Sequence, residues 1–455
     1  MHRFVLRKIL LLAAVFAVFT LAGCKKKPEK RLVIWTDNSE FAPFIELYNK
    51  SHRQKAILVY KENIADKLPP EPGELQPDII AGSLLKNGRT RKNFIPLDFL
   101  FNRKYLSTND FYGTLLKSGT FGHRQYLLPV NFNIPAMIFS TENENLIKND
   151  YTISLEEIKE AGAAFNKKNK KGSYTAIGFA PQSNADFLYT TAQLLGANFR
   201  EDKSSAFAYS SSAVEATTKY LKEWISAANT SPQTESDFVY KYLSETPDRQ
   251  VTSGRTLFSF VTSDKLFSMS AARLSGLDFR WLNNNGLIPV EDSMIYMGIA
   301  KQTKKALLAS EFISWFFTTE TQHIFIERKI KSNLDTTQFG IAGGFSSLKD
   351  VNEHILPVYY PAMLTNIPQA GIFAVPDKRP PTWNKIKYRV IIPYLSDSVQ
   401  TEDGKPVPSM EERYADLKKL GIYLNLSKLV EYRVFCKKNK SAGRFAICED
   451  FWRLN

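Results

Sequence analysis

The first 24 residues constrain this chain more than any other stretch. Basic residues stand at Arg3, Arg7 and Lys8, and an apolar run then covers residues 9–22. A basic start, a 14-residue apolar run and small residues before a cleavage point describe an export signal. The run is too short to span a bilayer comfortably, because about 20 apolar residues are needed. We therefore expect the folded part of the protein to begin after this segment.

The end of this segment, Leu21-Ala22-Gly23-Cys24, resembles a bacterial lipobox. In signals of that kind the Cys thiol takes a diacylglycerol, and cleavage leaves the Cys, here Cys24, as the new N-terminus. Each buried CH₂ contributes about 0.8 kcal/mol, so two or three acyl chains can hold a soluble domain at a membrane. The resemblance predicts a signal at residues 1–23 and a solvated tether at residues 24–31, with the protein lipid-anchored outside the cytoplasm. An uncleaved anchor, or an ordinary signal with a chance Cys, is the alternative.

The charge of the chain excludes few functions by itself. The net charge is +14, and loss of the signal would leave about +11. In the cytoplasm such a charge would suggest a nucleic-acid partner. The sequence has no zinc-finger spacing, no RNA-binding signature and no basic heptad region. We therefore expect no nucleic-acid partner.

Two cysteines remain besides Cys24, and both lie near the C-terminus. Cys436 and Cys448 bracket a 13-residue segment rich in Lys and Gly. Outside the cytoplasm they are candidates for a disulfide, a local staple that would contribute roughly 2–3 kcal/mol. Two free thiols are the alternative. Metal binding would need more ligands than this tail offers.

Strand and helix signals alternate through the rest of the chain. An apolar run at residues 32–35, a helical stripe through Phe44 and Tyr48, and a second apolar run at residues 56–60 form a βαβ unit, which makes the two strands parallel. Residues 77–81 read as a third strand. Ser154 to Glu157 is a capping box that opens another helix. This alternation predicts α/β layers, and 432 residues after the signal suit two domains.

Several short motifs, taken in order, resemble the extracellular solute-binding proteins of ABC importers, the group that includes maltodextrin receptors. The first is Ile34-Trp35-Thr36-Asp37, and the next is Pro77-Asp78-Ile79-Ile80. Leu127 to Ser140 resembles the segment where that family crosses between lobes, and Tyr296 to Ala300 resembles its returning strand. Residues 154–157 stand where the family carries a Trp-x-Glu-Leu helix start, although the Trp is absent. No single motif is diagnostic, but their order across nearly 400 residues is.

The resemblance implies an α/β fold of the two-lobed periplasmic-binding-protein kind, type II-like, in which each lobe is a mixed sheet flanked by helices. A hinge joins the lobes, and the solute binds between them. We expect hinges near Val130–Pro135, Val261–Lys265 and Thr318–Arg328. The expected boundaries are residues 32–131 with 265–318 for lobe one, residues 132–264 with 319–425 for lobe two, and 426–455 for a C-terminal extension.

The resemblance also implies the partners: a small solute, for which a sugar is the favoured class, and the membrane subunits of an importer. It implies a monomer that needs no cofactor, no metal and no catalytic residue. Cleft residues should follow the C-terminal ends of parallel strands. Sugars favour aromatic platforms edged by Asp, Asn or Gln. These rules select the following candidates: Trp35, Asp37, Asn38, Ser39, Ser83, Asn131, Asn133, Gln182, Asn184, Trp281, Asn283 and Trp383. The alternative for each Trp is packing in the protein, and the alternative for the asparagines is a role in a turn.

Three other functions are alternatives to a solute receptor. An exported enzyme finds little support, because the Gly-x-Ser-x-Gly, His-Glu-x-x-His and phosphate-loop motifs are all missing. A ferric receptor of the same fold is suggested by the adjacent Tyr359 and Tyr360. A lipoprotein that keeps the fold but acts as an interaction or sensor protein would suit the Lys-rich tail.

Overall fold

The computed structural model describes residues 31–203, 207–332, 338–401 and 405–419. Five of the expectations fall outside these residues: the signal at 1–23, Cys24, the tether at 24–31 except for Arg31, the Cys436–Cys448 pair and the extension at 426–455. Within the described residues, no helix is long and apolar enough to cross a membrane.

The first sheet has five strands in the order β2-β1-β3-β15-β6. Its strands β1, β2 and β3 are parallel, and β15 runs antiparallel to both of its neighbours. This confirms the βαβ unit and the third strand that the sequence predicts. The bounds are β1 Leu32–Thr36, β2 Ala56–Tyr60, β3 Ile79–Ser83, β6 Leu128–Pro129 and β15 Ile295–Ile299.

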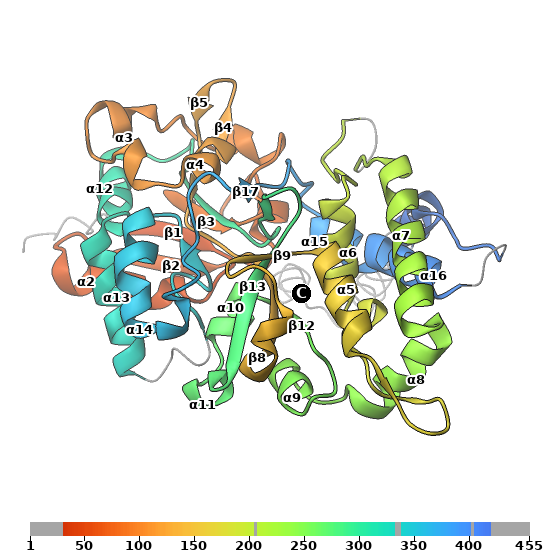
Figure 1. Cartoon of the computed structure of the whole chain (residues 1–455). Coiled ribbons are helices and arrows are strands. Elements are labelled where there is room, and N and C mark those ends of the chain that lie inside the picture. The colour runs from red at the N-terminus through yellow and green to blue at the C-terminus, as the bar shows by residue number, and fades with distance from the viewer. Residues whose placement is uncertain (1–30, 204–206, 333–337, 402–404, 420–455) are drawn as a thin grey trace, which may run out of the picture.

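Helices cover this sheet to form lobe one, on the left of Figure 1. They are α2 Phe41–Ser51, α3 Asp98–Asn102, α4 Gly113–Ser118, α12 Ala306–Phe316, α13 Thr319–Lys331 and α14 Leu356–Tyr359. Helix α2 lies against α13, where the rings of Phe44 and Phe325 stack with centroids 3.6 Å apart. The small hairpin of β4 Thr120–Phe121 and β5 Arg124–Gln125 lies at the edge of this lobe.

The second sheet has four strands in the order β12-β8-β13-β9. Strand β8 runs antiparallel to β12 and β13, and β13 runs parallel to β9. The bounds are β8 Pro135–Ser140, β9 Thr152–Ser154, β12 Ser259–Thr262 and β13 Leu277–Asn283. The short helices α10 Ser263–Phe267 and α11 Ala271–Leu274 connect β12 to β13.

A group of helices packs on one face of the second sheet and forms lobe two, on the right of Figure 1. The capping box is confirmed, because Ser154 Oγ accepts from the Glu157 N–H and the Glu157 carboxylate accepts from the Ser154 N–H. The elements are α5 Leu155–Phe165, β10 Lys167–Lys168, β11 Tyr174–Ala176, α6 Ala185–Leu194, α7 Ser211–Asn229, α8 Pro232–Tyr242, α9 Pro247–Thr252, α15 Trp383–Ile386 and α16 Ile392–Gln400.

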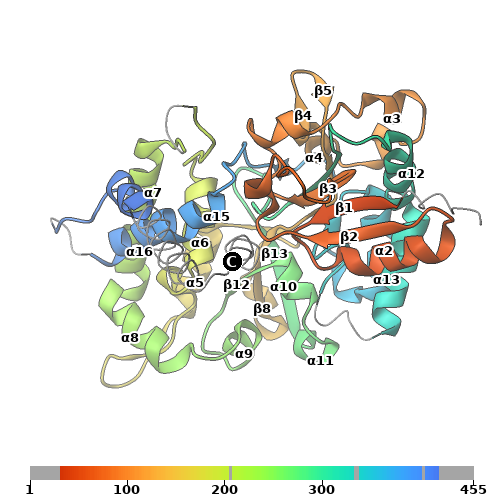
Figure 2. The same ribbon diagram turned by 180° about the vertical axis from the view of Figure 1, so that it is seen from behind.

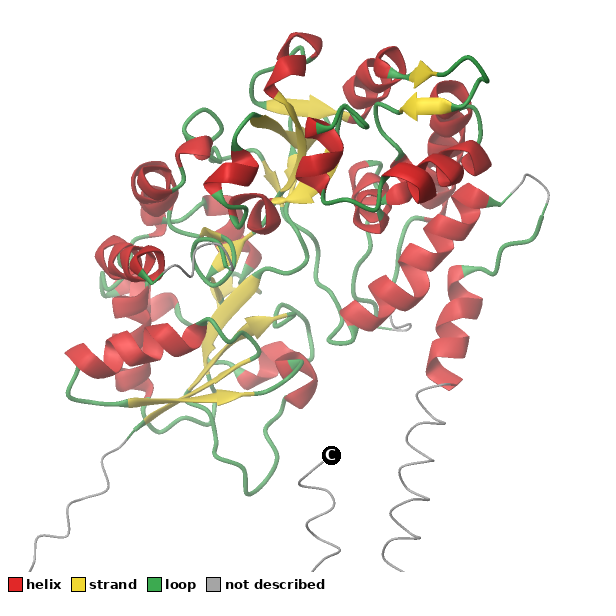
Figure 3. Ribbon diagram, turned by 90° about the horizontal axis from the view of Figure 1, so that it is seen from below, coloured by secondary structure: helices red, strands yellow, loops and turns green. Residues whose placement is uncertain are grey.

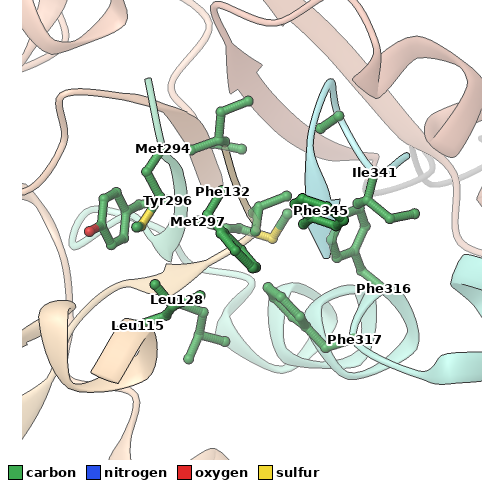
Figure 4. Close-up of a cluster of buried hydrophobic side chains, with 14 of the residues drawn as sticks. Leu115, Leu128, Phe132, Met294, Tyr296, Met297, Phe316, Phe317, Ile341 and Phe345 are labelled. Carbon is green, nitrogen blue, oxygen red and sulfur yellow. The ribbon is translucent and has the colours of Figure 1, made fainter. Parts of the chain in front are cut away.

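Apolar packing extends between the sheets. The main cluster fills lobe one, where α4, β6, β15, α12 and the strands β7 Asn131–Phe132 and β16 Phe345–Ser346 meet (Figure 4). It continues onto the second sheet, where the ring centroid of Trp281 in β13 lies 5.9 Å from that of Phe345. A second cluster occupies the opposite face of that sheet, with Met137 and Phe139 of β8 pointing into it.

The packing differs from the expected lobe boundaries in two places. Residues 319–425 were expected in lobe two, but α13, β16 and α14 all pack in lobe one. Helix α13 packs on α2, and Lys329 forms a buried ion pair with Glu40 at 2.8 Å. Residues 277–283 were expected in lobe one, but β13 pairs with β8 and β9 in the second sheet. Sequence distance misled in both cases, because the strands and helices of each lobe come from several separated segments.

Three segments carry the chain between the two lobes (Figure 3). Residues 130–134 connect the first sheet to β8, as expected near Val130–Pro135. Residues 284–294 lead from β13 back to β15 and include β14 Ile288–Pro289, which pairs with β17 Phe373–Ala374. Residues 364–382 lead from the helices of lobe one to α15. The expected hinge at Thr318–Arg328 is wrong, since those residues begin α13 inside lobe one.

Candidate ligand-binding site

A polar cavity of about 240 Å³ lies where both lobes and two of the connecting segments meet. Lobe one contributes the end of β3, and lobe two contributes the start of α6 and the turn after α15. The lining residues are Ser83, Leu84, Asn133, Asp186, Thr262, Asp264, Lys265, Glu291, Asp292, Ser293, Asn384, Lys387 and Tyr388. This position agrees with the rule that ligands bind beyond the carboxyl ends of parallel strands.

Charged side chains dominate the lining. The Asp186 carboxylate lies between two ammonium groups, with Lys387 Nζ and Lys265 Nζ each 3.8 Å from one of its oxygens. Burial raises the pKa of Glu291 to about 7, even though the charge of Lys387 lowers it; the neighbouring carboxylates of Asp292, Asp186 and Asp264 raise it further. The ammonium groups of the lining can therefore donate charged hydrogen bonds to a solute, and the carboxylates can accept them.

Asp292 connects three elements at the floor of this cavity. Its carboxylate accepts hydrogen bonds from Arg379 Nε at 3.0 Å, from Trp383 Nε1 at 2.9 Å and from the Tyr189 hydroxyl at 2.5 Å. Burial would raise the pKa of Asp292, but Arg379 and Lys387 outweigh it and hold the pKa below its usual value. The connecting segment 284–294 is therefore bound directly to α6 and α15 of lobe two.

The end of β3 is arranged by Asp37. The Asp37 carboxylate accepts from the Ser83 hydroxyl at 2.9 Å and from the Ser83 N–H at 3.2 Å. Burial raises the pKa of Asp37, and the two bonds from Ser83 partly offset this effect. Asp37 thus orients Ser83 at the cavity wall without itself lining it. Of the predicted cleft residues, Ser83 and Asn133 line the cavity.

The three predicted tryptophan platforms are wrong for this conformation. Trp35, Trp281 and Trp383 each have 0 % of their surface exposed. Their indole N–H groups donate to the Leu75 carbonyl, the Asn366 carbonyl and the Asp292 carboxylate respectively. Each ring is therefore packed on both faces, and the packing role of Trp accounts for all three.

The predicted asparagines Asn38, Asn131 and Asn133 have a structural role. Asn38 and Asn131 donate to the Ala342 carbonyl at 3.1 and 2.6 Å, and Asn133 donates to the Gly343 carbonyl at 2.9 Å. Ala342 and Gly343 both have positive φ, a conformation that the turn 340–344 needs and these amides stabilise. Their donor groups are thus already used.

The other predicted residues lie away from the cavity. Gln182 donates to the Pro232 carbonyl in lobe two, and Asn184 caps α6 by accepting from Phe187 N–H. Asn283 accepts from the Gly286 N–H in a turn. Ser39 is exposed just before α2.

Most lining residues were not predicted, above all Glu291, Asp292 and Lys387. One signal was present: the acidic pair directly follows the short apolar run 288–290, at the end of a strand. Lys387 had no comparable signal, because only the fold brings the segment after Trp383 to the end of β3.

The described residues offer little to a metal ion. Within them, no group of three or more His, Cys, Asp or Glu side chains could hold a metal. The Tyr359 hydroxyl lies 3.1 Å from His323 Nε2, and Tyr360 is buried in the core of lobe one. Neither tyrosine lines the cavity.

Solved structures of similar fold match most of the chain. An ABC substrate-binding protein from Listeria monocytogenes, solved with cycloalternan, has a TM-score of 0.55 and 14 % identity over 86 % of this chain and 98 % of its own. An extracellular solute-binding protein from Alicyclobacillus acidocaldarius has a TM-score of 0.55 and 12 % identity over 87 % and 98 %. The cyclic α-maltosyl-1,6-maltose binding protein from Arthrobacter globiformis has a TM-score of 0.54 and 13 % identity over 81 % and 93 %.

These likenesses show the two-lobed periplasmic-binding-protein fold. A comparison with curated protein sequences found no match. A model of a bacterial extracellular solute-binding protein family matches residues 75–332, which is more than half of the chain. That family consists of binding proteins rather than enzymes, and the cavity between the lobes agrees with such a role. The chain belongs to the bacterial extracellular solute-binding proteins.

Proposed function

We propose that this protein is the solute receptor of an ABC importer and that it binds a sugar in the cavity between its lobes. The observation that carries the proposal is the convergence of the β3 end, the connecting segments and lobe two on one polar cavity. Related folds that bind saccharides support the class of solute. The importer's membrane subunits would be its partner, and the receptor would act as a monomer.

The chemistry of the cavity suits hydroxyl groups. A sugar hydroxyl both donates and accepts, so it can bridge an ammonium such as that of Lys387 and a carboxylate such as that of Glu291. Both side chains line the cavity, and neither makes a side-chain hydrogen bond to the described residues. A solute that contacts both lobes favours the closed arrangement, because it binds that state more tightly.

A sugar panel with a matched pair of variants tests this proposal. We expect at least one monosaccharide or short oligosaccharide to raise the melting temperature of the protein. A solute present at 100 times its Kd stabilises the folded state by about 2.7 kcal/mol. Lys387→Met should weaken the binding of that sugar by about 10- to 150-fold, because a hydrogen bond to a charged group contributes roughly 1.5–3 kcal/mol. Titration calorimetry measures both effects.

Lys385→Met is the control, since Lys385 lies two residues away, is exposed and does not line the cavity. The affinity of the Lys385→Met variant for the sugar should equal that of the unchanged protein. Equal losses in both variants, or no response to any sugar, would refute the proposal.

We also propose that residues 1–23 are cleaved and that Cys24 carries the lipid that holds the receptor at a membrane outside the cytoplasm. The support is the basic, apolar and Ala-Gly-Cys order of the first 24 residues. In cells fed a labelled fatty acid, the intact chain should take up label and Cys24→Ala should not. Label retained by the Cys24→Ala chain would contradict the anchor.

A further inference from the structure

The turn at residues 84–88, directly after β3, is a firmly held part of lobe one. Its first residue, Leu84, lines the cavity and has a φ of 55°, a conformation that a bulky side chain rarely adopts without support. The Asn87 side chain gives this support. Its Oδ1 accepts from the Arg89 and Thr90 N–H groups at 3.0 and 2.9 Å, and its Nδ2 donates to the Leu84 carbonyl at 2.8 Å. The turn therefore holds its shape at the edge of the cavity.

Hydrogen bonds join this turn to the other side of the molecule. The Gly88 N–H donates to both carboxylate oxygens of Glu201, at 2.9 and 3.3 Å. The Lys86 ammonium donates to the Pro376 carbonyl at 2.8 Å. Burial lowers the pKa of Lys86 to about 8, so this ammonium is enclosed by protein rather than held in solvent. Lobe one is thus bound directly to the segments around residues 201 and 376.

Both of these segments are fixed to lobe two. Glu201 follows α6, and its N–H donates to the Lys378 carbonyl at 2.6 Å. The next residue, Arg379, forms an ion pair with Asp292, whose carboxylate also binds α6 and α15. Residues 376–379 are therefore held by lobe two, although they lie in a connecting segment.

A third contact crosses between the lobes from the same segment. The Lys378 ammonium lies 4.7 Å from the centroid of the Phe121 ring, in strand β4 of lobe one. A cation over an aromatic face is attracted by the ring. All three contacts are made by atoms of the chain alone, so they act whether or not a solute is bound.

We propose that Lys86 and Glu201 are positioning residues that latch the two lobes together and so set the fraction of the receptor that is closed. Closure brings Ser83 of lobe one and Lys387 of lobe two to the same cavity. A receptor whose binding-competent form is partly populated binds more weakly in proportion to that fraction. The latch therefore tunes affinity although neither of its side chains lines the cavity, and the inference holds for any class of solute.

Single-molecule energy transfer in the full chain, with no solute added, tests the latch. Dyes are attached through non-natural amino acids at Tyr105 of lobe one and Ser211 of lobe two, which are both exposed, and their separation grows as the lobes part. We expect the unchanged chain to be mostly in a closed population with high transfer. In Lys86→Met/Glu201→Ala the ratio of closed to open molecules should fall by at least about tenfold, because two hydrogen bonds to charged groups are lost.

Matched variants separate the latch from a general effect of charge. Lys92→Met/Glu215→Ala removes the same charges at exposed positions and should leave both populations unchanged. Glu201→Gln keeps an oxygen for the Gly88 N–H and should retain most of the closed population.

Two results would overturn the inference: an unchanged chain that is mostly open, or equal populations in the latch variant and the charge-matched variant. The first result needs no variant, so a poorly folded variant does not prevent the test. The sugar panel judges the proposed function separately. A failed latch would therefore leave the sugar receptor standing.

Discussion

Replacing Asp292 with Ala should destabilise the protein by about 3–5 kcal/mol, because the change leaves the buried charge of Arg379 without its partner. The side chains of Asp292 and Arg379 are both 6 % exposed, and Arg379 Nε lies 3.0 Å from Asp292 Oδ1. The Tyr189 hydroxyl and the Trp383 indole would lose the same acceptor. The change should also weaken solute binding, since Asp292 lines the cavity and binds segment 284–294 to lobe two. Chemical denaturation and calorimetry measure the two losses.

The pH dependence of this effect has a definite sign. The pKa of Asp292 is held below its usual value, so its contribution to stability is present above the unfolded pKa of about 3.9 and is lost as pH falls through the folded pKa. The deficit of the Asp292→Ala variant should therefore be full at pH 7 and shrink below about pH 4. A second change, Arg379→Met, should restore part of the stability at pH 7. A deficit that stays constant down to pH 3, or a double variant as unstable as the sum of both changes, would contradict the ion pair.

The second large effect is expected from Lys329→Met in α13. Lys329 and Glu40 are both 5 % exposed, and the Lys329 ammonium also donates to the Gln338 and Gly340 carbonyls at 3.0 Å. The variant should lose about 3–5 kcal/mol, because it leaves the Glu40 carboxylate buried and unpaired. The turn 340–344 would lose support as well, so we expect solute affinity to fall together with stability. Denaturant unfolding with and without solute measures this.

Glu40 sets the pH dependence of that variant. Burial already raises the pKa of Glu40, and Lys329 lowers it, so removal of Lys329 should raise it further. A carboxyl group with a raised folded pKa loses stability as pH rises from the unfolded value of about 4.3. The deficit should thus be smaller at pH 4.5 than at pH 8. Lys331→Met is the control, since Lys331 is 70 % exposed on the same helix and should leave stability unchanged. An equal effect of both variants would argue against the buried pair.

Much of the fold follows from local sequence patterns. The βαβ unit and the capping box at Ser154 depend on neighbouring residues alone, and each is found where it was predicted. The lobe boundaries depend on contacts between distant segments. The Phe44–Phe325 stack and the Lys329–Glu40 pair draw α13 into lobe one, and no local pattern in residues 319–331 indicates this.

The site was harder to predict than the fold for the same reason. The rule on strand ends selected Ser83, which lies at the end of β3 and lines the cavity. The preference of sugars for aromatic rings selected Trp35, Trp281 and Trp383, but each indole N–H found a partner inside the protein. Exposure decides whether a ring binds or packs, and a single sequence does not report exposure.

The most direct test of the account is a crystal structure of the protein grown with the tightest-binding sugar of the panel. The account predicts the sugar between the lobes, with hydrogen bonds to Lys387 from lobe two and to Ser83 from lobe one. A sugar bound on the outer surface of one lobe, with no contact to either side chain, would contradict it.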